Sequence, residues 1–164
     1  LSGALDNFGD AVTYVLSLMV VGAGGAAKAR VALVKGFLIL GAAIAVAVQI
    51  GWRVANPDTP VFEVMGIAAL VNLGANLFCL WLLTPYRAGD VNMSSAWECS
   101  RNDVWEGFAV LAAALAVWAF GSGWPDIVIA GGLLILFLRS SIRVLLRAWR
   151  ELKLVAEDRE KALR

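Results

Sequence analysis

The stretch GFAVLAAALAVWAFGSGWP, residues 107–125, contains no charged side chain. A helix needs about 20 mostly apolar residues to cross the roughly 30 Å hydrocarbon core of a bilayer, so this stretch is long enough to span one. A second uncharged run, GFLILGAAIAVAVQIGW, occupies residues 36–52. Both runs are continuously apolar and do not alternate with polar residues, which favours helices over strands. We therefore expect membrane-spanning helices.

The composition of the whole chain points the same way. Of its 164 residues, 60% are hydrophobic and 16% are charged. Soluble domains usually have about 45–50% apolar and about 25% charged residues, so the composition excludes an ordinary cytosolic enzyme and a disordered chain. The formal net charge of +1 leaves no basic surface to attract nucleic acid. The chain is expected to be an integral membrane protein with lipid as its surroundings.

Five apolar segments follow one another along the chain, so we expect an all-α fold, a polytopic bundle of five transmembrane helices. Clusters rich in Gly, Pro, Asn and Asp separate the segments, and such clusters mark turns. The predicted spans cover residues 2–22, 33–53, 62–84, 96–120 and 125–147, within a transmembrane domain of residues 1–149. Residues 150–164 are predicted to form a charged cytoplasmic tail.

Lys and Arg are distributed unevenly between the loops. They occur between the first two spans, after the third span and throughout the tail, whereas the alternate loops hold only Arg53. Cytoplasmic loops carry the excess of basic residues, so we expect these loops and the C-terminus in the cytoplasm and the chain in the plasma membrane, the inner membrane of a bacterium. This orientation puts residue 1 at the outer face, and we expect one further span upstream.

Ionisable residues inside the spans indicate a site. Asp6 and Asp10 are four residues apart, so both carboxyl groups lie on one helix face, and Cys99 and Asp103 repeat this spacing in the fourth span. An Asp at the bilayer centre costs roughly 2.5–3.5 kcal/mol and usually marks an ion or proton path. If the two helices face each other, three carboxyl groups and one thiol meet. Mixed oxygen and sulfur ligands suit a four-coordinate transition metal and disfavour Mg²⁺ and Ca²⁺.

Other polar residues extend this predicted path. Asn72 and Asn76 share a face of the third span, where they either line the path or form hydrogen bonds between helices. Glu106 lies seven residues after Cys99 and can share its face, whereas Glu98 is expected at the cytoplasmic mouth.

The remaining polar and small residues predict contacts with lipid and between helices. Residues 139–150 carry arginines at helical spacing, which we expect to reach cytoplasmic headgroups. Gly41, Gly131 and Gly132 are expected to permit close approach of helices. Cys79 is expected to pack as a small apolar side chain.

The two pairs, in this order and separated by two apolar spans, resemble the cation diffusion facilitator family, over residues 5 to about 149. In that family the second of six transmembrane helices carries Asp-x-x-x-Asp and the fifth carries His-x-x-x-Asp, and the four side chains form the transport site for Zn²⁺ or a related ion. Asp6 and Asp10 match the first motif. Asp103 matches the aspartate of the second, and Cys99 stands where the family has histidine.

The resemblance implies helices two to six of the family's domain, without its first helix and its large cytoplasmic C-terminal domain. It implies export of a divalent cation, coupled to inward proton movement by alternating access, in a homodimer. Zn²⁺ is the favoured substrate, with Cd²⁺ or Co²⁺ as alternatives, because cysteine replaces a residue that determines selectivity. No prosthetic group is implied.

Two other classes of function stay open. The chain can be a non-transporting scaffold or accessory subunit whose aspartates hold helices together, or a cation or proton channel that works without alternating access. An enzyme is not expected, because the chain has no histidine and no Ser/His, Cys/His or phosphate-loop motif.

Overall fold

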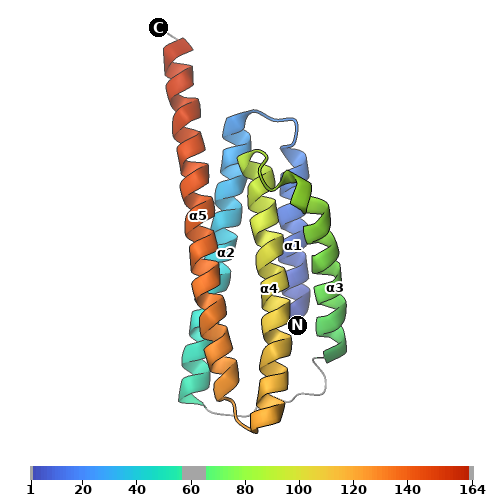
Figure 1. Cartoon of the computed structure of the whole chain (residues 1–164). Helices are drawn as coiled ribbons and strands as arrows, with labels where there is room; N and C mark the ends of the chain where they lie inside the picture. The colour runs from blue at the N-terminus through green and yellow to red at the C-terminus, as the bar shows by residue number, and fades with distance from the viewer. Residues whose placement is uncertain (1, 57–65, 163–164) are drawn as a thin grey trace.

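The computed structural model describes the backbone of residues 2–56 and 66–162, and side chains of residues 10–56 and 70–162. The chain is all-helical over these ranges (Figure 1). The elements are α1 (Ser2–Met19), α2 (Gly25–Ala55), α3 (Gly66–Leu83), the short 3-10 helix η1 (Thr84–Tyr86), α4 (Val91–Phe120) and α5 (Trp124–Ala162). The expected all-α fold is therefore confirmed.

Local sequence explains where the central helix α4 begins and ends. The Asp90 carboxylate accepts hydrogen bonds from the backbone N–H groups of Asn92 and Met93, both at 3.0 Å, and so caps the first turn. At the other end Gly121 adopts a φ of 60°, a left-handed conformation that glycine allows without strain. Pro125 then occupies the first turn of α5, where its missing N–H costs nothing.

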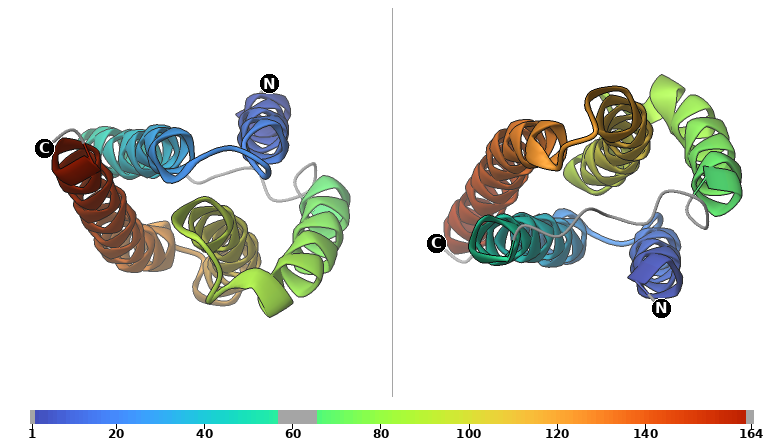
Figure 2. Two further views of the ribbon diagram at one scale, coloured as in Figure 1. Left: turned by 90° about the horizontal axis from the view of Figure 1, so that it is seen from above. Right: turned by 90° about the horizontal axis from the view of Figure 1, so that it is seen from below.

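Helix α4 lies at the centre of the bundle. It contacts α1, α2, α3 and α5, and views along the bundle show α2 and α5 on one side of it and α1 and α3 on the other (Figure 2). A polar residue on α4 can therefore meet partners from any of the other four helices. The most extensive helix pair is α2 with α5.

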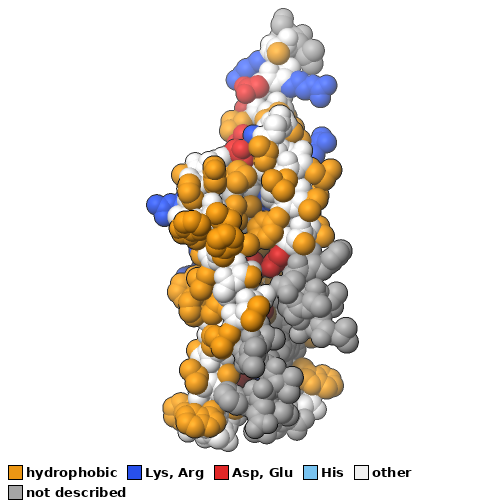
Figure 3. All heavy atoms as spheres, turned by 90° about the vertical axis from the view of Figure 1, so that its right-hand side faces the viewer, with side chains coloured by type: hydrophobic (Ala, Val, Ile, Leu, Met, Phe, Trp, Pro, Cys, Tyr) orange, Lys and Arg blue, Asp and Glu red, His pale blue; other side chains and the backbone are white. Residues whose placement is uncertain are grey.

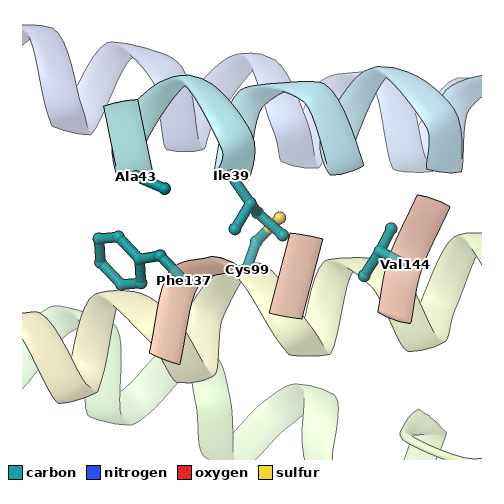
Figure 4. Packing of buried hydrophobic residues seen from close by; sticks show 5 residues of the cluster. All are labelled: Ile39, Ala43, Cys99, Phe137 and Val144. Carbon is teal, nitrogen blue, oxygen red and sulfur yellow. The ribbon is translucent and has the colours of Figure 1, made fainter. Parts of the chain in front are cut away.

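Small and branched side chains line the seam between α2 and α5. On α2 they alternate at intervals of three and four residues: Ala29, Ala32, Gly36, Ile39 and Ala43. This spacing is typical of helices that cross at a small angle. Figure 4 shows Ile39 and Ala43 opposite Phe137 and Val144 of α5, with Cys99 of α4 beside Ile39. The hydroxyl of Ser141 adds a hydrogen bond of 2.9 Å to the carbonyl oxygen of Gly36.

The glycines at close helix contacts are not the predicted ones. A Cβ on Gly36 would lie 2.7 Å from Leu145 Cδ2, and a Cβ on Gly107 would lie 2.9 Å from a methyl carbon of Leu73 on α3. For Gly41, Gly131 and Gly132, no described atom lies within 4 Å of such a Cβ, so the prediction for these three was wrong. Helix rotation, which the sequence does not specify, decides which glycine meets a neighbour.

Three helices, α2, α4 and α5, are long and apolar enough to cross a membrane, and residues 10–19 and 70–86 form shorter apolar helical stretches. The bundle buries polar side chains beside its apolar seam and exposes large apolar ones: Lys35 and Asn92 are 0% exposed, whereas Trp118 is 74% exposed. Figure 3 shows apolar side chains over much of one face, with Lys and Arg gathered toward the end where the C-terminus lies. Such a surface is compatible with a lipid environment.

Helix α5 continues without a break through the expected boundary between domain and tail at residues 149 and 150. A Cβ on Gly25 would lie 3.2 Å from Val155 Cγ2, so the start of α2 packs against the extended part of α5. The charged segment is therefore an extension of the last helix.

Candidate functional site

Two carboxylates from different helices lie in one region of the bundle interior. Asp10 projects from α1 and Asp103 from α4, and the charges of both act on the thiol of Cys99 and the hydroxyl of Tyr14. Asp10 and Asp103 are half-buried and each makes further interactions. Three of the four predicted metal ligands, from α1 and α4, are therefore near enough for the two carboxylates to act electrostatically on the thiol.

Tyr14 is a site residue that the sequence prediction missed. It lies four residues after Asp10, so residues 6, 10 and 14 form one stripe along α1, and this spacing was available as a signal. Its hydroxyl interacts with the side chain of Ser100 on α4. Neither hydroxyl reaches full hydrogen-bond geometry with any partner in the described residues. Both groups therefore have hydrogen-bonding capacity to offer to a bound species.

Cys99 lies where α4 meets the apolar seam. It is 8% exposed and packs in the cluster that includes Ile39 of α2 and Phe137 of α5 (Figure 4). The positive charge of Lys35 also acts on it. The thiol therefore packs against apolar side chains of α2 and α5 and also feels charged groups from α1, α2 and α4.

The other predicted residues have different surroundings. The side chain of Asp6 lies outside the described residues. On α3, Asn76 is buried and Asn72 is half-buried, while Glu106 of α4 is half-buried and interacts with other groups. Within the described side chains, no three acidic or cysteine residues come close enough together to hold a metal ion.

A buried lysine joins three helices near the end of α1. Lys35 of α2 donates hydrogen bonds to the side-chain oxygen of Asn92, at 2.7 Å, and to its carbonyl oxygen, at 2.9 Å. The amide nitrogen of Asn92 in turn donates to the carbonyl oxygen of Ser17 on α1, at 3.0 Å. A buried charge requires such partners because an unpaired one would cost several kcal/mol. The contact fixes α1, α2 and α4 relative to one another beside Cys99.

Glu98 belongs to a network between α4 and α5 that the sequence did not predict. Its two carboxylate oxygens accept hydrogen bonds from Arg101 and Arg143, each at 2.6 Å. Ser140 accepts from Arg101 at 2.8 Å and donates to Asn102 Oδ1 at 2.9 Å. Glu98 is buried and ion-paired, so its charge is balanced by basic partners.

The chemistry of the two groups follows from these partners. The Glu98 network is internally balanced and holds helices together, whereas the region of Asp10, Cys99 and Asp103 is rich in acidic groups. Two carboxylates and a thiol favour a divalent cation or protons over an anion. Comparisons of the chain with protein-family models and with curated proteins give no match.

Proposed function

We propose that this chain exports a divalent transition-metal cation across a membrane in exchange for protons. The metal site consists of Asp10, Cys99 and Asp103 together with Asp6. The observation that carries the proposal is that carboxylates from two helices, Asp10 of α1 and Asp103 of α4, both act electrostatically on the Cys99 thiol, in a bundle whose long helices are apolar. The motif resemblance to the cation diffusion facilitator family supports it.

Energetics favour a functional role for the two aspartates. Each carboxylate costs roughly 2.5–3.5 kcal/mol near the centre of a bilayer, and helices can be held together by the cheaper hydrogen bonds of Asn or Ser. Glu98 shows how this bundle neutralises a buried carboxylate with two arginines. The carboxylates of Asp10 and Asp103 and the positive charge of Lys35 all act on the Cys99 thiol. An arriving divalent cation would be attracted by the carboxylates.

Proton coupling follows from the ligand chemistry. Carboxylate and thiol groups must lose their protons to coordinate a metal ion, so metal and protons compete for the same atoms. When the metal leaves toward the outer side, protons take its place. Movement of the helices exposes the site first to one side of the membrane and then to the other. Because metal and protons compete for the same atoms, this movement exchanges metal for protons across the membrane. The five helices then act as five spans, with the basic end in the cytoplasm of a bacterial cell, and two copies associate in the membrane.

Metal binding to the purified protein is the first test. Zn²⁺, Cd²⁺ and Co²⁺ are titrated into the wild type, Asp10→Asn and Asp103→Asn, with Asp126→Asn as a matched carboxylate-to-amide control outside the cluster. Asp126 forms an ion pair with Arg53 at the far end of α2. We expect one ion per chain at micromolar concentration, lost in the first two variants and kept in the control. Equal binding by all four proteins would mean that the aspartates are structural.

Transport in proteoliposomes separates the three classes of function. An exchanger moves Zn²⁺ against its gradient when an opposing proton gradient is applied, a channel only dissipates gradients, and a scaffold moves nothing. Cys99→His is expected to keep transport and to shift preference from Cd²⁺ toward Zn²⁺, because imidazole is a harder ligand than thiolate. Transport with unchanged preference would remove Cys99 from the ligand set.

A further inference from the structure

A groove of about 230 Å³ lies on the surface between α4 and α5, on the side of the Glu98 network. Its polar part is lined by three arginines, Arg101, Arg139 and Arg143, and its apolar part includes Ile135 and Leu136. The volume is below the range of about 300–1,000 Å³ that drug-sized ligands occupy. It suits a small anionic group with an apolar continuation.

The charges in the groove do not balance. Arg101 and Arg143 share the single carboxylate of Glu98. Arg139 has no ion pair with any residue that the structure describes, so three guanidinium groups face one carboxylate. An anion in the groove would balance the excess positive charge.

The guanidinium groups are held in place before any ligand arrives. Glu98 fixes one nitrogen each of Arg101 and Arg143 at 2.6 Å, and Arg101 also stacks 5.1 Å above the ring centre of Trp97. Each guanidinium has five N–H donors in a rigid fork that matches the oxygens of a phosphate. The remaining donors are available because the side chains of Arg101 and Arg143 keep 23% and 43% of their surface exposed.

The position of the groove along α5 matches the boundary between the hydrocarbon core and the headgroups of a bilayer. With a rise of about 1.5 Å per residue, Arg139 and Arg143 lie roughly 22 and 28 Å along α5 from Trp124. Trp124 is exposed, as expected for a tryptophan at the opposite interface. The arginines thus lie about one hydrocarbon thickness from that interface, with the apolar part of the groove below them.

We propose that this groove binds an anionic phospholipid, with its phosphate on Arg101, Arg139 and Arg143 and an acyl chain along Ile135 and Leu136. Charge complementarity selects an anionic headgroup over a zwitterionic one, and the continuous apolar lining selects a lipid over a soluble phosphate. The bound lipid joins α4 to α5 at the level of the Glu98 network. The proposal depends on membrane insertion and is independent of metal transport.

The test uses delipidated protein in detergent, with binding of phosphatidylglycerol and of phosphatidylcholine with the same acyl chains measured by native mass spectrometry. Arg139→Gln is the main variant because Arg139 takes no part in the internal network. Arg147→Gln is the control. Arg147 lies on the same helix about two turns beyond Arg139 and does not line the groove. We expect phosphatidylglycerol to bind preferentially, and its affinity to fall about fivefold in Arg139→Gln and to stay unchanged in Arg147→Gln.

Three outcomes would overturn the proposal. The first is equal binding of phosphatidylglycerol and phosphatidylcholine, and the second is an equal fall in phosphatidylglycerol affinity in Arg139→Gln and Arg147→Gln. The third is displacement of the bound lipid by glycerol 1-phosphate at the same concentration as the lipid. The last would assign the groove to a soluble phosphate. Zn²⁺ is also titrated into Arg139→Gln from the same preparation. If the lipid groove and the metal site are independent, this variant binds Zn²⁺ as tightly as the wild type does.

Discussion

At the scale of single residues, Asp90 combines two roles at the start of α4. Its carboxylate caps the helix and forms an ion pair with Lys28 of α2, with 2.9 Å between Nζ and Oδ2. Burial raises the pKa of the Asp90 carboxyl, but the hydrogen bonds from Lys28 and from the backbone N–H groups of Met93 and Asn92 outweigh it and hold the pKa below the ordinary value of 3.8. The ionised form is therefore stabilised by folding.

Asp90→Asn is predicted to keep the cap and to lose only the charge. A carboxyl whose pKa is lowered in the folded state contributes stability above its unfolded pKa, and this contribution disappears as pH falls through the folded value. Thermal unfolding in detergent should show the wild type more stable than Asp90→Asn at pH 6, with the difference shrinking as pH falls below the ordinary Asp value of 3.8. Asp90→Ala should cost roughly a further 0.5–2 kcal/mol at pH 6. A constant difference between wild type and Asp90→Asn would contradict this assignment.

A second prediction concerns Tyr14 in the candidate site. Its hydroxyl lies within the influence of Asp10, Asp103 and Cys79, so it is placed to orient a proposed metal ligand. Groups that orient ligands typically change metal affinity by about 10- to 100-fold when they are removed. Tyr14→Phe should therefore bind Zn²⁺ at least about tenfold more weakly, at unchanged stoichiometry, in equilibrium titration. Tyr86→Phe, at the exposed end of η1, serves as control, and equal affinities in the two variants would make Tyr14 a packing residue.

Only part of the candidate site could be predicted from the sequence. The four-residue spacing of Asp6 and Asp10, and of Cys99 and Asp103, places each pair on one helix face, because the helical repeat is fixed. The pairing of Glu98 with Arg143 spans 45 positions and depends on how α4 and α5 are rotated against each other. Nothing in the local pattern specifies that rotation, so Glu98 had been expected at the mouth of a path.

At the scale of elements, Gly36 controls the approach of α2 to α5. A Cβ there would lie 2.8 Å from Leu145 Cγ and 3.3 Å from Val144 Cγ1, and Val is stiff about χ1. Gly36→Ala should therefore destabilise the bundle by about 1–3 kcal/mol, as overpacking does. Gly41→Ala faces open space and should be neutral or stabilising by up to about 1 kcal/mol, because alanine favours helix.

The stabilities of Gly36→Ala and Gly41→Ala are compared by thermal unfolding in the same detergent. Gly36→Ala combined with Leu145→Ala should recover part of the loss, because the shorter side chain leaves room for the new methyl group. Equal midpoints for Gly36→Ala and Gly41→Ala would show that α2 and α5 do not pack as closely as described.

The turn between α4 and α5 was predicted better than the start of α2 and the end of α5. Glycine at position 121 and proline at 125 separate α4 from α5 in the expected place, because the restrictions on these residues are local. In contrast, α2 begins at Gly25 and not near residue 33, and α5 continues to Ala162. Apolar runs report only the apolar part of a helix, and the polar extensions of both helices pack on each other where Gly25 meets Val155.

At the scale of the whole molecule, the described turns lie at two opposite ends of the bundle. The turn around Gly22, between α1 and α2, lies at the end from which α5 extends, and the turn around Ser122, between α4 and α5, lies at the other end (Figure 1). Lys28 and the basic part of α5 lie toward the first end, so an excess of cytoplasmic positive charge would place that end inside the cell. The direction of the proposed export depends on this orientation.

Single cysteines test the orientation in a Cys79→Ala, Cys99→Ser background. Ser122→Cys should react with a membrane-impermeant maleimide on intact bacterial cells, and Gly22→Cys should react only after the cells are permeabilised, because the inner membrane shields it. Gly22 has no described atom within 4 Å of an added Cβ, so local packing does not explain protection there. The reverse pattern would invert the chain and make the proposed exporter an importer. Labelling of both positions on intact cells would mean that no membrane separates the two ends, which removes the basis for transport altogether.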